Sequence, residues 1–345
     1  MPTAEVEALI GHTEGFQPRR FLRNGHLQTI AGNYLSRIND LPAPEDQLVE
    51  VSPASANQIA SLVLCQCHWQ PEEVRAGRPT AIIVHGLEGS SNSQYVVGNS
   101  NKLWRAGCNI IRMNMRNCGG TEALSPTLYH SGLSNDVLSV VNFFVTRYGL
   151  QSISLIGYSM GGNLVLKLAG ELGAAAPATL HSVIGVSPAV DLGPSADALH
   201  LPQNRLYELK FLYHLLRRFR RKAVLFPRAY DRNRATGIHS LRQFDDRITA
   251  LYSGFTSADD YYYRAAAARV VDRIAVPTLI LHALDDPFIR FTQQSREIIK
   301  ANPNITLIES RHGGHCAFLA EPHVTGDYDG YWAEHTLLRF LFSHA

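Results

Sequence analysis

The sequence predicts an open α/β fold in which helices flank a mostly parallel sheet of eight strands. Three observations predict it: short apolar runs rich in Val, Ile and Leu, helical patterns that alternate with these runs, and a length of 345 residues. Unbroken apolar runs are typical of strands that are buried on both faces of a parallel sheet. Repeated strand–helix–strand units place helices on both faces of such a sheet.

Eight segments have the composition of strands, and helical patterns lie between them. The expected strands are 48–51, at an edge of the sheet, followed by 59–67, 80–84, 108–113, 153–156, 182–186, 278–281 and 305–308. The expected helices are 94–105, 132–148, 160–172, 293–300 and 331–342. We expect these elements to form one domain that comprises residues 1–345.

Segment 191–272 interrupts the alternation after the sixth strand. It has no strand pattern, but it has a helical pattern over 206–222 and a run rich in Tyr and Ala over 259–269. We therefore expect a mostly helical insertion at the carboxyl edge of the sheet. We favour a lid over the functional site, and additional helices packed on the sheet are the alternative.

Charge and composition exclude several classes of protein. A formal net charge of +2 is too small for nucleic-acid binding through a basic face. No run approaches the roughly 18–20 apolar residues of a membrane-spanning helix, and the first residues do not resemble a secretory signal. Five cysteines do not suggest a paired disulfide framework, so we expect a cytoplasmic protein.

The residues Cys65, Cys67 and His68 have no second pair of metal ligands nearby in the sequence. We therefore predict a buried strand at this position in preference to a zinc site. Nothing else in the sequence requires a metal or an organic cofactor, and we expect neither.

The motif Gly157-Tyr158-Ser159-Met160-Gly161 directly follows an expected strand and directly precedes an expected helix. Gly-x-Ser-x-Gly in this context is typical of a nucleophile on a sharp strand-to-helix turn. Small residues on both sides let the Ser159 hydroxyl stand clear of the sheet. The amino end of the following helix also favours negative charge that develops at the serine.

A serine nucleophile needs a base and an acid that orients it, and on this architecture they follow in the order acid, histidine. We predict His315 as the base in preference to His312, because it follows two glycines and precedes an apolar run. We favour Asp286 over Asp285 as the acid, because Asp285 can hold its own turn. Asp191, after the sixth strand, is a third candidate.

Two backbone N–H groups are expected to form an oxyanion hole. One belongs to Met160, after the nucleophile, and the other to Leu87, in the loop after the third strand. We expect His85 to shape that loop and not to act as a second base. Segment 217–222 carries five cations in six residues and fits either weak contact with a lipid surface or a solvated helix face.

The chain resembles the YheT-like branch of the α/β hydrolases, to which ABHD-type lipases are related. The resemblance covers residues 20–340, and its motifs are Asn24-Gly25-His26-Leu27-Gln28-Thr29, His85-Gly86-Leu87-Glu88-Gly89-Ser90-Ser91, Met115-Arg116-Asn117-Cys118-Gly119-Gly120, Tyr129-His130-Ser131-Gly132, 157–163, Asp285-Asp286-Pro287-Phe288 and Gly313-Gly314-His315. It implies the α/β-hydrolase fold and a serine hydrolase of carboxylic esters, with Ser159, Asp286 and His315 at the matching positions. The sequence alone gives no role to the first of these motifs.

We expect the substrates to be small esters with short- to medium-chain acyl groups, with acylglycerols as further candidates. A thioesterase or an amidase that uses the same three residues is an alternative. A lipid- or ligand-binding protein that has kept the pocket without the chemistry is another, since a fold does not determine a substrate.

Overall fold

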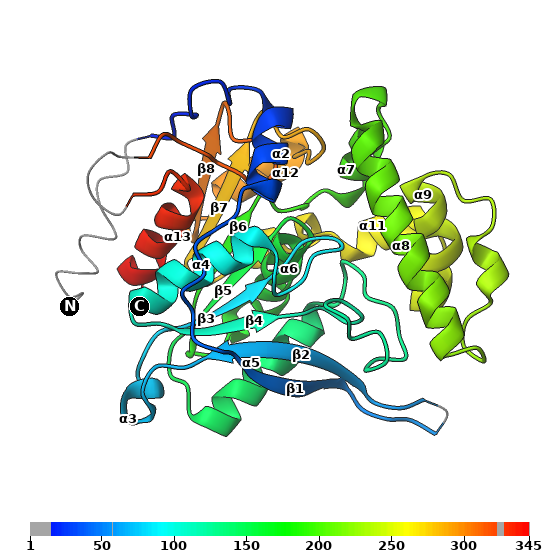
Figure 1. The fold of residues 1–345 in the computed structure, drawn as a ribbon, viewed down its shortest axis with the longest axis horizontal. Helices are drawn as coiled ribbons and strands as arrows, with labels where there is room; N and C mark the ends of the chain where they lie inside the picture. The colour runs from blue at the N-terminus through cyan, green and yellow to red at the C-terminus, as the bar shows by residue number, and fades with distance from the viewer. Residues whose placement is uncertain (1–14, 57, 323–327, 345) are drawn as a thin grey trace.

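The computed structural model describes residues 15–56, 58–322 and 328–344 (Figure 1). The strands are β1 (Glu45–Ser52), β2 (Ser61–His68), β3 (Thr80–Val84), β4 (Asn109–Met113), β5 (Ile153–Tyr158), β6 (Leu180–Val186), β7 (Thr278–Ala283) and β8 (Ile305–Ser310). The helices are α2 (Gly25–Tyr34), α3 (Glu72–Arg75), α4 (Gln94–Arg105), α5 (Ser134–Tyr148), α6 (Met160–Leu172), α7 (Leu192–Leu199), α8 (Arg205–Leu225), α9 (Leu241–Phe244), α10 (Leu251–Ser253), α11 (Ala258–Ala265), α12 (Gln293–Ala301) and α13 (Trp332–Ser343).

The eight strands form one sheet in the order β1-β2-β4-β3-β5-β6-β7-β8. All neighbours from β4 to β8 are parallel, whereas β2 is antiparallel to both β1 and β4. The mostly parallel sheet is confirmed, and β1 occupies the predicted edge. Cys65 and Cys67 are buried free thiols on β2.

Two apolar cores lie on the two faces of the sheet, because successive side chains of a strand point to opposite faces. Ile82 of β3 belongs to the core that includes residues of α5, α6 and α12, whereas Ile83 belongs to the core formed with α4 and α13. Figure 1 shows α4 and α13 side by side on one face of the sheet. These buried strands fix the sheet edge at which the functional residues meet.

The helical insertion (residues 191–272) contains α7 to α11 and short 3-10 and π-helical turns, with no strand. It lies beyond one end of the sheet, at the right of Figure 1. Its apolar residues, Leu212 and Phe219 of α8 among them, extend the core that includes α5 and α6. The insertion is thus packed on the rest of the domain, and its role as a lid stays a prediction.

Helix α2 was not expected from the sequence, because its apolar pattern is weak. Asn24 caps it by accepting hydrogen bonds from the backbone N–H groups of His26 (2.9 Å) and Leu27 (3.3 Å). The helix expected from residue 132 begins at Ser134, since Gly132 donates its N–H to the His130 ring and closes a turn. No helix within the described residues is long and apolar enough to span a bilayer.

Candidate active site

Ser159 stands on the turn between β5 and α6, with φ = 54° and ψ = −115°. A non-glycine residue in this region is strained, and such strain persists only where the surroundings enforce it. The Ser159 N–H donates to the Val186 carbonyl at 2.9 Å, and the Ser159 carbonyl accepts from Asn163 (3.0 Å). The turn is therefore fixed from both sides, as a nucleophile elbow requires.

The glycines of the motif are required by close packing and not by positive φ angles. A Cβ atom at Gly157 would collide with the Gly161 backbone, and one at Gly161 would collide with the carbonyl oxygens of Val84 and His85. The elbow thus lies directly on the end of β3. Larger residues at these two positions would push the serine away from the loop that follows β3.

His315 and Asp286 meet at the carboxyl edge of the sheet, where His315 Nδ1 lies 2.8 Å from Asp286 Oδ2. The other oxygen of Asp286 accepts from the N–H groups of Phe288 (3.1 Å) and Ile289 (2.9 Å). Burial raises the pKa of Asp286, but His315, the Ile289 N–H and His282 outweigh burial and hold the pKa below its usual value. An ionised Asp286 is suited to orient the imidazole.

The other candidate acids have different partners. Asp285 accepts from the N–H of Gly314 at 2.9 Å, and its other carboxylate oxygen lies 3.4 Å from His312 Nδ1. Asp285 therefore lies beside His312, whereas Asp286 contacts His315. Asp191 accepts from the Thr292 N–H at 2.7 Å, at the start of α12. In the structure, His315 therefore pairs with Asp286, and Asp285 holds the backbone of Gly314, the residue before His315.

Ser159 and His315 line the same groove. Among the described residues, the hydrogen bonds of His315 Nε2 go to Cys316 Sγ (3.5 Å), and none joins it to Ser159 Oγ. Catalytic hydrogen bonds are often long without substrate and tighten in the substrate complex. Cys316 thus lies at the nitrogen that would receive the serine proton, a neighbour that the sequence analysis missed.

We expect the Cys316→Ala substitution to shift the pH profile of hydrolysis toward lower pH. Burial lowers the pKa of His315, but Cys316 and Asp286 raise it, and the net shift is upward from 6.5. A general base acts in its neutral form, so kcat/KM should rise with pH and should still be rising above pH 6.5 in the wild type. Removing Cys316, one of the two groups that raise the pKa of His315, should therefore move the rising part of the pH profile to lower pH. If kcat/KM rose over the same pH range in the wild type and in Cys316→Ala, Cys316 would not raise the pKa of the catalytic base.

The loop 85–89 follows β3 and lies against the elbow. A Cβ atom at Gly86 would lie 3.1 Å from Ser159 Cβ, and Leu87 lines the cavities beside Ser159. His85 is buried, accepts from the Met115 N–H at 3.1 Å and has its pKa lowered to about 4, with burial as the main cause. These contacts fit its expected role in shaping the loop.

Glu88 ties this loop to the helical insertion. It has φ = 57°, and its carboxylate accepts from Arg218 of α8 through two nitrogens, at 2.9 and 3.0 Å. Both side chains are mostly buried, and Tyr129 donates to the same carboxylate at 2.5 Å. This two-pronged ion pair fixes the residue after Leu87, which accounts for the acidic residue of the His-Gly-Leu-Glu-Gly motif.

We expect Glu88→Gln to lower the free energy of unfolding by about 3–5 kcal/mol, because it removes the carboxylate that contacts two nitrogens of the mostly buried Arg218. It should also lower kcat by up to about 100-fold, since a displaced Leu87 N–H weakens one oxyanion donor. Chemical denaturation and steady-state hydrolysis measure the two effects. The matched control is Glu122→Gln, because Glu122 approaches Arg218 only at 3.6 Å. Equal losses in both variants would contradict the role of Glu88.

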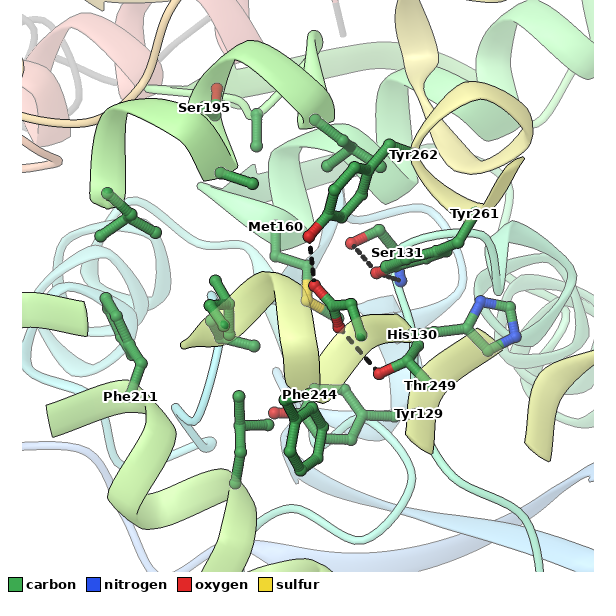
Figure 2. Close-up of a pocket in the computed structure, with 18 of the residues that line it drawn as sticks. Tyr129, His130, Ser131, Met160, Ser195, Phe211, Phe244, Thr249, Tyr261 and Tyr262 are labelled. Atoms are coloured by element: carbon green, nitrogen blue, oxygen red, sulfur yellow. Dashed lines mark hydrogen bonds between the residues drawn. The ribbon is translucent and has the colours of Figure 1, made fainter. Parts of the chain in front are cut away.

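An apolar cavity extends from Ser159 into the helical insertion. Figure 2 shows Met160, Phe211 and Phe244 around it. Asp245, the acidic residue of its lining, accepts from Tyr262 (2.7 Å) and Thr249 (2.8 Å). Burial raises the pKa of Asp245 to about 6. The cavity therefore suits an apolar chain.

A second pocket, a groove with several exposed lining residues, meets this cavity at Ser159. Residues of α2, such as Ile30 and Tyr34, line one side, and residues of α8, such as Tyr207 and Lys210, line the other. Leu87, Phe211 and Phe288 line both the groove and the cavity. An ester carbonyl at Ser159 would place one part of the molecule in the apolar cavity and the other in the groove between α2 and α8.

The Asn-Gly-His-Leu-Gln-Thr motif supports the loop that carries His315. Thr29 accepts from the His315 N–H at 2.8 Å, and Gln28 exchanges hydrogen bonds with the backbone of Leu319 at 2.9 and 3.0 Å. Gly25 packs so closely on the Asp285 carbonyl that a Cβ atom would collide with it. The His26 ring stacks on Tyr207 of α8. The motif thus positions the histidine loop, a role that only long-range contacts reveal.

Only some of the cations in the basic segment 217–222 are exposed to solvent. Arg218 is committed to Glu88, and Lys222 is fully buried and donates to the carbonyl oxygens of Glu122 and Ser125. Burial lowers the pKa of Lys222 to about 7. The exposed cations of the segment are Arg217, Arg220 and Arg221.

Comparisons with known proteins identify the fold family of the chain. A family model described as the alpha/beta hydrolase fold matches residues 79–322. YheT of Escherichia coli K12, provisionally named an esterase, is 30% identical over 307 residues, which are 88% of this chain and 87% of YheT. The mouse phospholipase ABHD3 is 30% identical over 70% of this chain and 59% of its own length, and the yeast monoacylglycerol lipase is 28% identical over 76% and 59%.

Solved structures agree on the fold. The Pyrococcus furiosus esterase Pf2001 superposes with a TM-score of 0.54 at 13% identity, covering 89% of this chain and 98% of that one. Est1E from Butyrivibrio proteoclasticus gives a TM-score of 0.52 at 15% identity over 87% and 98%. The chain therefore belongs to the alpha/beta hydrolase fold family, and within that family to the YheT-like branch.

Proposed function

We propose that the protein is a serine hydrolase that cleaves carboxylic esters with short- to medium-chain acyl groups, acylglycerols among them. The observation that carries the proposal is the position of a strained Ser159 and of His315, which pairs with the buried Asp286, on one groove at its junction with an apolar cavity. The names of the relatives, which include an esterase and two lipolytic enzymes, support the same reaction class.

The proposed reaction has two steps. Ser159 Oγ attacks the ester carbonyl while His315 Nε2 takes its proton, and the N–H groups of Leu87 and Met160 hold the oxyanion. The imidazolium then gives its proton to the departing alcohol, which leaves an acyl-enzyme. Water then attacks the acyl-enzyme while His315 Nε2 takes a proton from the water, and His315 gives that proton to Ser159 Oγ as the carboxylic acid departs. Asp286 holds the tautomer of His315 throughout.

A fluorophosphonate probe followed by peptide mapping tests the nucleophile. We expect one covalent adduct, on Ser159, and none after Ser159→Ala, because the probe needs an activated serine. A protein that remains unlabelled under conditions in which it is folded would favour the non-catalytic binding protein.

Substrate profiling tests the reaction class. We expect p-nitrophenyl esters from acetate to laurate to be cleaved with a maximum at an intermediate chain length, because residues of the helical insertion line the apolar cavity and limit its depth. An acyl-CoA and an anilide with the same acyl chain serve as controls for thioesterase and amidase activity. A higher kcat/KM on either control would replace the ester in the proposal.

A further inference from the structure

The outer face of α8 combines large apolar side chains with cations. Its exposed residues are Leu206, Leu209, Lys210, Tyr213, Arg217, Arg220, Arg221, Val224 and Leu225. They recur at about helical spacing, so they form a stripe about 28 Å long at 1.5 Å per residue. Leu206 is 82% and Tyr213 61% exposed. Helix α8 is described over its whole length, and its single acidic residue, Glu208, is buried.

A second apolar cluster lies on α2, across the mouth of the groove. Tyr34 is 69% and Ile30 48% exposed, and both line the groove. Lys210 links the two helices, because its ammonium group lies 3.4 Å from the Tyr34 hydroxyl and 5.2 Å from the centre of the Tyr34 ring. The exposed residues of α8 together with Ile30 and Tyr34 form one surface, the α2–α8 face, around the opening that leads to Ser159.

The cations of this face have few acidic neighbours. Lys210, Arg217 and Arg220 form no ion pair with a described acidic residue, and Arg221 approaches Glu122 only at 3.7 Å. By contrast, Arg218 and Lys222 on the inner side of the same helix have buried partners. The positive charge on the outer face is therefore available to an external anion.

We propose that the α2–α8 face docks the protein on a lipid–water interface that contains anionic lipids. Contiguous exposed apolar side chains mark interaction surfaces, and aromatic and aliphatic residues flanked by Lys and Arg suit insertion at the headgroup level. Cations without acidic neighbours complement lipid phosphates. The interface would cover the mouth of the groove, so a lipid chain reaches the apolar cavity without crossing bulk water. Docking itself does not depend on the proposed chemistry.

Vesicle flotation of the full-length Ser159→Ala protein tests docking without turnover. We expect binding to phosphatidylcholine vesicles that contain about 30% phosphatidylglycerol, and at least about tenfold weaker binding to pure phosphatidylcholine. High salt should weaken the binding because it screens the surface potential. Absence of binding, or equal binding to both vesicles, would overturn the proposal while leaving the hydrolase function intact.

Two pairs of variants locate the contact. The double variants Leu209→Ser/Tyr213→Ser and Arg217→Glu/Arg220→Glu should each lower the partition coefficient by about tenfold or more. Leu48→Ser on edge strand β1 and Arg78→Glu at the amino end of β3 are matched controls that should bind like the parent. Adsorption that is sensitive to charge but not to Leu209 and Tyr213 would overturn insertion. Turnover of a soluble ester by the same variants on the wild-type background should be unchanged.

Discussion

Ser159→Ala should lower kcat for ester hydrolysis by about 10⁶-fold, the largest effect expected of any single substitution in this chain. The methyl group cannot form the acyl-enzyme, so His315 and Asp286 lose the proton that they are arranged to move. A residual rate about 10³–10⁴ above the reaction in water should remain, because the oxyanion donors and the cavity are unchanged. Steady-state hydrolysis of a p-nitrophenyl ester, with thermal unfolding as the control for folding, measures this.

The same reasoning predicts that the losses do not add. Without the Ser159 hydroxyl, His315 has no nucleophile to deprotonate, and its orientation by Asp286 no longer affects the rate. The double variant Ser159→Ala/Asp286→Asn should therefore be as slow as Ser159→Ala alone. A double variant slower by the product of the two single losses would mean that His315 and Asp286 support a second, serine-independent route.

The sheet and the elbow could be predicted because their signals are local. Strands buried on both faces have unbroken apolar sequences, and Gly157 packs against the Gly161 backbone within one strand–turn–helix unit. The order serine, aspartate, histidine followed from placing each residue after a strand. The choice between Asp285 and Asp286 was weaker, because the two neighbouring carboxylates differ only in which histidine they reach.

Other features depend on contacts between distant segments. Thr29 holds the backbone of His315, which lies 286 positions away, and Glu88 pairs with Arg218, 130 positions away. No spacing in the sequence indicates either contact. The buried position of Lys222 is easier to predict from the sequence, because Lys222 follows Leu215 and Phe219 at helical spacing on the buried side of α8. The cluster of five cations in six residues suggests one charged surface, although the helical spacing divides these cations between the buried and the exposed side of α8.

Asp286→Asn is expected to lower kcat by about 10⁴-fold, because an amide can no longer fix the imidazole tautomer or stabilise the imidazolium. Since Asp286 raises the pKa of His315, the remaining activity should also show its rising limb at lower pH than the wild type. The adjacent Asp285→Asn is the matched control. Its amide oxygen can still accept from Gly314 N–H, so we expect a loss of less than about tenfold.

These two neighbouring substitutions separate catalysis from support of the histidine loop. Both replace a carboxylate in one turn after β7 by an amide of the same size, yet only Asp286 contacts His315. If Asp285→Asn caused the larger loss of kcat, or if it alone moved the rising limb of the pH profile, the acid would be Asp285. The described geometry would then have to change on substrate binding. A loss and a pH shift confined to Asp286→Asn would tie the charge at that position to the basicity of His315.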